Sequence, residues 1–322
     1  MPEQKQNSKS FKTMIGGQAI IEGIMMIGPK KKAIVVRKPD GELEVKEEER
    51  TLIKDRYPIL GYPILRGIVG FGSSMTTGVK ALMWSTEFFP EEEEEPSKFE
   101  RWLEGRLGSE KMTKLVVSTA VFMGIAFSVG LFILLPTLIS GGLAGLIPGF
   151  PLWGRSVLEG ILRVAIFLGY LIMCSRLQDI KRVFSYHGAE HKTVFCYEAG
   201  LPLTVENVRP QPCHHPRCGT SFLFVVIIVS ILVSMAVFTP LHIENTFVRM
   251  GLHLLILPLI VGVTYEFNRY IGGHDNGLCR FMRAPGLWLQ NFTTNEPDDT
   301  MIEVGIRALT LVLPEEKGKD EW

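Results

Sequence analysis

Four long apolar segments constrain the fold of this chain more than any other feature. They cover residues 113–136, 156–175, 221–243 and 247–267. Each is close to the length of about 20 apolar residues that crosses the hydrocarbon core of a bilayer as a helix. A chain that is 46% apolar and still 21% charged fits apolar spans joined to charged soluble parts. We therefore expect a mainly α-helical, polytopic membrane protein with about four transmembrane helices.

The basic residues between these segments predict the orientation of the chain in the membrane. The loop 176–220 contains six Lys and Arg residues, whereas 137–155 contains only Arg155 and 244–246 contains none. Cytoplasmic loops carry the excess of Lys and Arg in membrane proteins. We therefore expect a multi-pass protein of the plasma membrane with the loop 176–220 and both termini in the cytoplasm.

The regions outside the membrane domain 113–267 predict a small cytoplasmic α+β cap. In the N-terminal region 1–112, residues 33–37 and 42–46 flank the turn sequence Lys38-Pro39-Asp40-Gly41, which is typical of a β-hairpin. The C-terminal tail 268–322 contains an amphipathic helical pattern at 301–311, which Asp298 or Asp299 can cap.

Several other segments have less regular patterns. Residues 59–84 are apolar and rich in glycine, which fits an interfacial helix, a re-entrant segment or a fifth span. We favour an interfacial or partly buried segment, because a fifth span would move the first 56 residues across the membrane. Residues 138–151 are too short to span, 269–290 are expected to be irregular, and the acidic run 91–95 is expected to be a solvated linker.

A short motif in the cytoplasmic loop predicts a metal site. His187 and His191 are separated by four residues, so a helix would place both on one face, with Glu190 beside them. His-x-x-Glu-His is the inverted zinc-peptidase pattern, in which the histidines bind the metal and the glutamate is the catalytic base. A third ligand is needed, and Glu266, where the fourth apolar segment ends, is one candidate.

A second group of metal-ligand residue types follows in Cys213-His214-His215-Pro216-Arg217-Cys218. His215 and Cys218 are the strongest candidates, because they are three residues apart directly before the third apolar segment. Cys213 and His214 fit ordinary loop residues. The alternative is a tight turn without metal, in which Cys218 packs as a small apolar side chain.

Charged residues also lie inside the apolar segments. Glu159 and Arg163 are one helical turn apart, as are Arg249 and His253. Charges inside a membrane are usually paired or functional, so we expect an ion-pair network between the second and fourth segments, with a transport path as the alternative.

Five motifs together resemble one known family. They are residues 16–26 (Gly-Gly-Gln-Ala-Ile-Ile-Glu-Gly-Ile-Met-Met), 186–193, 215–222, 265–266 and 293–298. On this set the chain resembles the YqhQ-like family of uncharacterised bacterial membrane proteins over nearly its whole length. The resemblance implies a predicted metal-dependent enzyme, without a substrate or a reaction.

Two classes of function remain open from the sequence. The first is a metal-dependent membrane enzyme, hydrolytic in type, with zinc or another divalent metal bound at the cytoplasmic membrane surface. The second is a transporter or a membrane scaffold with a structural metal. The expected partners are membrane lipids and an unknown substrate or protein, whereas the zero net charge gives no support for nucleic-acid binding.

Overall fold

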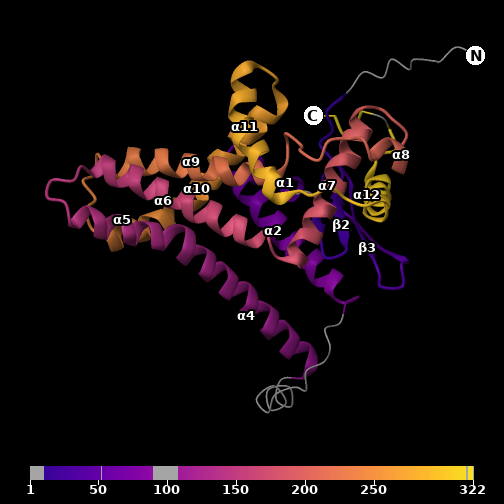
Figure 1. Cartoon of the computed structure of the whole chain (residues 1–322), viewed down its shortest axis with the longest axis horizontal. Helices are drawn as coiled ribbons and strands as arrows, with labels where there is room; N and C mark the ends of the chain where they lie inside the picture. The colour runs from indigo at the N-terminus through magenta and orange to yellow at the C-terminus, as the bar shows by residue number, and fades with distance from the viewer. Residues whose placement is uncertain (1–10, 52, 90–107, 317, 322) are drawn as a thin grey trace, which may run out of the picture. The chain divides into compact units, whose positions relative to one another are not determined.

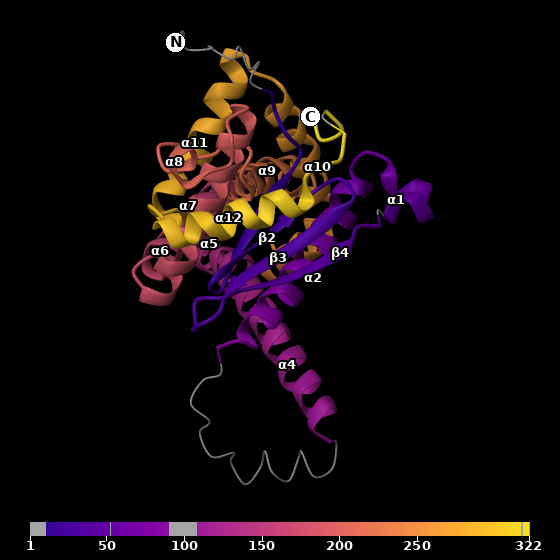
Figure 2. The same cartoon turned by 90° about the vertical axis from the view of Figure 1, so that its right-hand side faces the viewer.

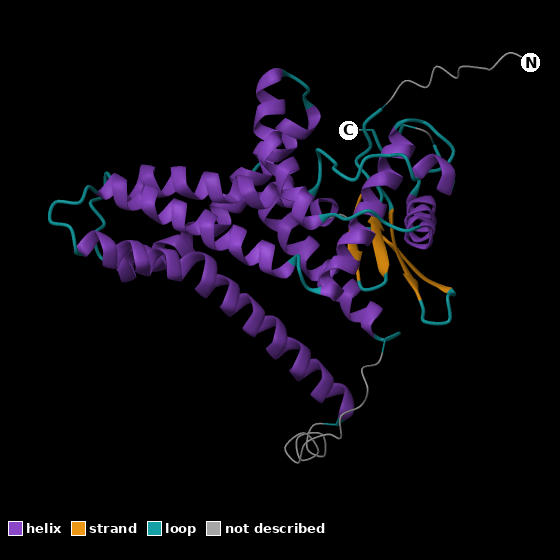
Figure 3. Cartoon of the chain, viewed as in Figure 1, coloured by secondary structure: helices purple, strands orange, loops and turns teal. Residues whose placement is uncertain are grey.

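The computed structural model describes residues 11–51, 53–89, 108–316 and 318–321, so the acidic run 91–95 lies outside the described residues. The described chain is mainly helical, and its named strands form one four-stranded antiparallel sheet near the N-terminus (Figure 3). The fold class expected from the sequence is confirmed. By contacts the chain divides into two units. Unit 1 comprises Met1–Phe89, Tyr170–Val226 and Leu259–Trp322, and unit 2 comprises Pro90–Gly169 and Ile227–Pro258.

The sheet of unit 1 extends the predicted hairpin by two strands. Its strands pair antiparallel in chain order, as β1 (Gly16–Ile20), β2 (Gly23–Ile27), β3 (Lys31–Arg37) and β4 (Leu43–Glu49). The hairpin expected at 33–37 and 42–46 is confirmed as β3 and β4. The glycine-rich segment 16–26 supplies most of β1 and β2, which the sequence analysis did not assign to strands.

Helices cover both faces of this sheet. Consecutive residues of β2 and β3 are apolar and buried, which is expected when neither face meets water. On one face, Ile24 and Val35 pack with Tyr186 of α7 (Gln178–Glu198) and Leu309 of α12 (Asp299–Val312). Figure 2 shows α12 lying across β2 and β3. On the other face, Met25 and Ile34 belong to a cluster with Ala81 of α2 (Leu65–Thr86).

Within the described residues, three helices are long and apolar enough to cross a membrane: Leu115–Gly145, Leu152–Cys174 and Thr246–Gly273. Phe222–Phe238 is a shorter apolar helix, so each of the four predicted segments forms an apolar helix. These helices suggest a multi-pass membrane protein. The first is longer than predicted. It continues from α4 (Ser109–Val129) through a π-helical turn, η2 (Gly130–Leu134), into α5 (Leu135–Gly145). Pro136 therefore does not end it, because a proline is tolerated in the first turn of α5.

The other apolar helices are α6 (Leu152–Cys174), α9 (Gly219–Phe238) and α10 (Thr246–Gly273). In unit 2, α5 contacts α6 through Thr137 and Glu159, and its Gly141 lies against Thr246 of α10; Figure 1 shows these helices. The helix α2, which covers most of 59–84, is not among the three candidate spans. Its Gly78 packs against the Gln18 side chain of β1, so this part of α2 is buried against the sheet.

The remaining helices are α1 (Ile53–Arg56), η1 (Pro58–Gly61), α8 (Val205–Val208) and α11 (Gly277–Thr293). The expectation that 269–290 is irregular is wrong. Asn276 caps α11 by accepting a hydrogen bond from the backbone N–H of Cys279, and the helix continues through Pro285. The helix predicted at 301–311 is confirmed as α12, and its cap is Asp298, whose side chain accepts from the Met301 N–H.

Candidate metal centre

The helix α7 places two histidines of the motif side by side. His187 and His191 lie one turn apart, and their ring centroids are 4.3 Å apart. Gly188 lies between them, and a Cβ on it would come within 2.1 Å of the Asn295 carbonyl oxygen. Glycine at 188 therefore allows the segment after α11 to lie directly against α7.

Backbone carbonyls fix which nitrogen of each histidine is available. His187 Nδ1 lies 2.7 Å from the Thr293 carbonyl oxygen, and His191 Nδ1 lies 2.5 Å from that of Cys213. A carbonyl oxygen only accepts, so each Nδ1 carries a hydrogen and donates it. Each Nε2 then keeps its lone pair, as in histidines that bind metals through Nε2 and are oriented by a carbonyl.

Cys218 completes a group of three candidate ligands. Its Sγ lies 3.2 Å from His187 Nε2, and the ligand atoms of His187, His191 and Cys218 all lie within 4.8 Å of one another. Zinc bonds of about 2.0–2.3 Å in a tetrahedron place neighbouring ligand atoms roughly 3.5 Å apart. Cys218 precedes α9, and the Thr220 backbone N–H donates to its sulfur at 3.4 Å. This group, the His/Cys cluster, could hold a metal ion.

His215 lies next to His191 but is not a member of the His/Cys cluster. The two ring centroids are 5.6 Å apart, but both ring nitrogens of His215 have other neighbours. The Arg217 N–H donates to Nδ1 at 3.4 Å, and Nε2 lies 3.6 Å from a carboxylate oxygen of Glu198. Burial lowers the pKa of His215 to about 4, so its ring is neutral at neutral pH. The structure thus brings Cys218, but not its predicted companion His215, to His187.

The side chain of Cys213 points elsewhere. Its Sγ lies 3.2 Å from Glu296 Oε2, and burial together with this carboxylate raises the pKa of the thiol to about 12. Cys213 is not one of the three residues of the His/Cys cluster. Cys213 contributes instead through its carbonyl oxygen, which orients His191.

Glu190 faces the sheet beside the His/Cys cluster and is not one of its three members. Its Oε1 accepts a hydrogen bond of 2.9 Å from the backbone N–H of Gly17 on β1. A Cβ on Gly17 would lie 3.0 Å from the Glu190 carboxyl carbon, so glycine permits this close approach. Burial raises the pKa of Glu190, although the neighbouring His187 and the Gly17 N–H both favour its charged form.

Glu266 is engaged away from the His/Cys cluster. Its carboxylate receives two hydrogen bonds from the Arg66 guanidinium, and the Ile64 backbone N–H donates to it at 3.3 Å. The structure therefore does not bring this predicted third ligand to His187 and His191; Cys218 occupies that place.

Residues that the sequence analysis did not single out hold these segments together. The Gln290 side chain accepts from the His215 N–H at 2.7 Å and donates to its carbonyl oxygen at 2.9 Å. Lys192 donates to the Arg209 carbonyl oxygen at 2.7 Å and pairs with Glu296. Backbone carbonyls that orient a ligand, such as that of Thr293, carry no residue-specific signal in the sequence. An amphipathic helix recognised at α11 would have pointed to Gln290.

Two further carboxylates near turns, Glu22 and Asp275, have partners of their own. Glu22 accepts from Arg182 and from the Tyr186 hydroxyl at 3.1 Å, and these contacts hold it at a φ of 50°, which is unusual for a residue with a side chain. Asp275 pairs with Arg280 and Arg283. Neither carboxylate belongs to the His/Cys cluster.

Comparisons with known proteins agree with the resemblance noted above. The family model described as "Protein of unknown function (DUF1385)" matches residues 62–315. The chain is similar to "Uncharacterized protein YqhQ" of Bacillus subtilis (strain 168), at 33% identity over 304 residues, which is 92% of each chain. No solved structure matches. Neither description names an activity.

Proposed function

This chain belongs to the DUF1385 family of proteins of unknown function. We propose that it is a metal-dependent enzyme that hydrolyses a substrate at the cytoplasmic membrane surface. One observation carries the proposal: two histidines with Nδ1 committed to carbonyls present Nε2 beside the Cys218 sulfur. Three protein ligands leave a fourth position for water or substrate, which is the arrangement of catalytic rather than structural zinc sites.

The proposed chemistry assigns separate roles to the residues of α7. A divalent metal held by His187, His191 and Cys218 would polarise water or a substrate oxygen. Glu190 would accept a proton from water as the water oxygen bonds to the electrophilic atom of the substrate, and would return it to the leaving group as the scissile bond breaks. A glutamate beside a mixed imidazole–thiolate set, but not bound to the metal, is the general acid–base of zinc deaminases.

The helix α11 supports a substrate at the membrane surface. It begins four residues after the end of α10, one of the three candidate spans. Leu278, Phe281 and Trp288 are exposed on it, whereas Gln290 and Thr293 are buried and hold the metal-site segments. An amphipathic helix with exposed large apolar side chains is typical of the membrane interface. The excess of Lys and Arg in the loop 176–220 supports the cytoplasmic side of the plasma membrane for this interface.

The competing proposal is a structural metal in a transporter or scaffold. The burial of His191 and Glu190, at 2% and 6% exposure, favours it, because a catalytic site must admit its substrate. The number of protein ligands discriminates between the two. A fourth protein ligand would close the shell and favour the scaffold, whereas three ligands and an exchangeable water favour the enzyme.

Metal analysis of the purified full-length protein tests the site. We expect about one zinc per chain in the wild type and none in His187→Ala or Cys218→Ala, because two ligands hold a metal far more weakly than three. His214→Ala is the matched control, since His214 is exposed and lies in the same segment as Cys218. Equal metal content in all four proteins would reject the His/Cys cluster as the binding site.

A further inference from the structure

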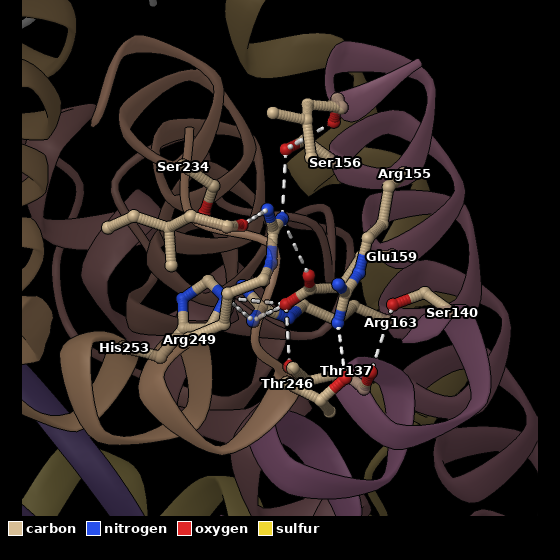
Figure 4. A network of polar contacts seen from close by, with 12 residues as sticks. Thr137, Ser140, Arg155, Ser156, Glu159, Arg163, Ser234, Thr246, Arg249 and His253 are labelled. Carbon is tan, nitrogen blue, oxygen red and sulfur yellow. Dashed lines mark hydrogen bonds and ion pairs between the residues drawn. The ribbon is translucent and has the colours of Figure 1, made fainter. Parts of the chain in front are cut away.

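Four helices of unit 2 converge on one buried carboxylate, Glu159, at the centre of the network in Figure 4. Its Oε1 accepts from Thr137 of α5 at 2.6 Å and from Arg163 of α6 at 2.5 Å, and lies 2.5 Å from His253 Nε2 of α10. Its Oε2 accepts from Arg249 of α10 at 3.2 Å. Ser230 of α9 accepts from Arg163 at 3.1 Å, which brings the fourth helix into the network.

The charges in this network do not balance. Arg155, Arg163 and Arg249 are buried, at 6%, 6% and 0% exposure, and we call them the arginine cluster. Among the described residues of unit 2, Glu159 is the one buried carboxylate, and the exposed Glu244 offers Arg155 its backbone carbonyl. Three guanidinium charges against one buried carboxylate leave an excess of two positive charges among the buried groups, which the exposed Glu244 carboxylate near Arg155 offsets only in part. Guanidinium groups do not deprotonate in proteins, so the excess persists unless a further anion is present.

Each arginine also keeps one donor without an acceptor. Arg155 donates through its terminal nitrogens to the Glu244 carbonyl and to Thr246 Oγ1, and Arg249 donates to the Ile243 carbonyl and to Ser156. The Nε atoms of all three arginines are buried and have no hydrogen-bond partner among the described residues. Buried donors almost always have partners, and three unpaired N–H groups on cations fit an acceptor of negative charge.

The position of the cluster along the helices indicates how an anion would reach it. Arg155 is the fourth residue of α6 and Thr246 is the first of α10, so both lie near helix ends. Arg163 lies two turns further along α6, about 12 Å deeper by helical rise. A Cβ on Gly141 would come within 2.5 Å of Thr246 Oγ1 and 2.8 Å of an Arg155 terminal nitrogen. The glycine therefore lets α5 pack directly against Thr246 and the Arg155 guanidinium, the arginine nearest the helix ends.

We propose that Arg155, Arg163 and Arg249 bind a phosphate-type anion at this end of the membrane helices, either the phosphate of an anionic lipid headgroup or free phosphate. The anion neutralises the excess charge that Glu159 leaves, and its oxygens accept the N–H groups that lack partners. Arg155 forms the entrance and Arg163 the deepest contact. This site is independent of the His/Cys cluster and of the function proposed for it.

Thermal stability with and without the anion tests this site. The full-length protein is placed in phosphatidylcholine nanodiscs, alone, with phosphatidylglycerol, or with inorganic phosphate in the buffer. A ligand that binds only the folded state raises the Tm, and the shift grows with the ratio of free ligand concentration to Kd. A shift with phosphatidylglycerol alone assigns the site to a lipid headgroup, and a shift with inorganic phosphate assigns it to the free anion. No shift with either overturns the proposal.

Two variants and a control distinguish anion binding at the arginine cluster from a nonspecific effect of basic side chains. Arg155→Gln removes one charge and its donors, so we expect roughly tenfold weaker anion binding, the size of a charge-assisted hydrogen bond. Arg176→Gln, an exposed arginine outside the network, should bind as the wild type does. Glu159→Gln raises the charge excess from two to three and should enlarge the anion-dependent Tm shift. An equal response of Arg155→Gln and Arg176→Gln, or a Tm loss in Glu159→Gln that no anion reverses, contradicts the proposal.

Discussion

The protein contains two polar clusters of opposite chemistry. The His/Cys cluster presents two imidazole Nε2 atoms and one sulfur, which are the atoms through which these side chains bind a metal. The arginine cluster presents three buried Nε–H groups, which are donors without acceptors. Metal-ligand atoms that lie close together favour a cation, and unpaired donors on cations favour an anion. The chemistry of the side chains thus indicates the charge of the expected ligand in each unit.

The two clusters also differ in how their members are held. Each imidazole is oriented by a backbone carbonyl from a separate segment, so one ligand set depends on the packing of α7, α11 and the loop before α9. The arginines lie on α6 and α10, two of the candidate membrane spans, and are held by Glu159 and by hydroxyl groups. We therefore expect metal affinity at the His/Cys cluster to depend on the residues that support its ligands. Anion affinity at the arginine cluster should depend on the charges of the cluster.

The largest expected difference between the clusters is the side of the membrane near which each one lies. The loop before α6 and the loop before α10 flank the arginine cluster, and the basic loop 176–220 contains the His/Cys cluster. A cytoplasmic reporter fused after Gly200 should be active, and one fused after Gly149 should be inactive, because six basic residues lie in one loop and one in the other. Activity of both fusions, or the opposite pattern, would contradict the topology and move the metal centre outside.

The next largest effect concerns catalysis at the His/Cys cluster. Glu190→Gln keeps the size of the side chain and removes the proton acceptor, so metal content should stay near wild type. The rate of the reaction should fall by roughly 10²–10⁴, the usual contribution of a general base. His191→Ala should lose metal and function together. The measurements are metal content and complementation of a strain that lacks the gene.

A different outcome would change the function assigned to this cluster. If Glu190→Gln complements fully while His191→Ala fails, the metal is structural and Glu190 serves to hold Gly17 of β1. If both variants complement fully, the His/Cys cluster is not the centre of the protein's function. Glu22→Gln is the control, because Glu22 also contacts α7, through Arg182. It tests whether the loss of any carboxylate that contacts α7 impairs complementation.

Much of the fold was predictable because it follows from local periodicity. The apolar segments, the hairpin β3–β4 and the cap of α12 by Asp298 all depend on nearby residues. The strands β1 and β2 were missed because glycine-rich 16–26 is a strand only through its pairing with β3 and its burial under α2 and α7. The helix α11 was missed because Pro285 and neighbouring glycines usually break helices, whereas packing overrides that preference here.

The site was predictable to a similar degree and for the same reason. The adjacency of His187 and His191 follows from helical spacing alone. Which residue joins them does not: His215 and Cys218 are three residues apart, yet only Cys218 reaches His187, because Glu198 and Arg217 occupy the His215 ring. Glu266 was an equally plausible candidate by sequence, but Arg66, 200 residues away in the chain, holds it.

A smaller effect is expected from the support around the metal ligands. Gln290→Leu removes both hydrogen bonds to the His215 backbone and leaves that buried peptide unpaired, which loosens the segment carrying Cys218. We expect metal affinity to fall about tenfold, the lower end for such supporting residues, as measured by competition with a chelator. Asn291→Ala, at an exposed neighbouring position, should leave the affinity unchanged. Unchanged affinity in Gln290→Leu would show that the loop before α9 holds its shape without α11.

The smallest effect should change folding without changing either cluster. Asp298 caps α12, so Asp298→Ala should lower the free energy of unfolding of unit 1 by about 1 kcal/mol, whereas Asp298→Asn should retain the cap.

Burial opposes ionisation of Asp298, but hydrogen bonds from Thr300 and the Met301 N–H outweigh it and lower its pKa below the ordinary 3.8. A lowered carboxyl pKa stabilises the fold above the unfolded pKa, and this contribution disappears as the pH falls through the folded pKa. The wild type should therefore lose stability relative to Asp298→Asn below about pH 4. Metal content and the anion-dependent Tm shift should be the same in both variants. A change in either would mean that these two measurements respond to the stability of the protein rather than to ligand binding.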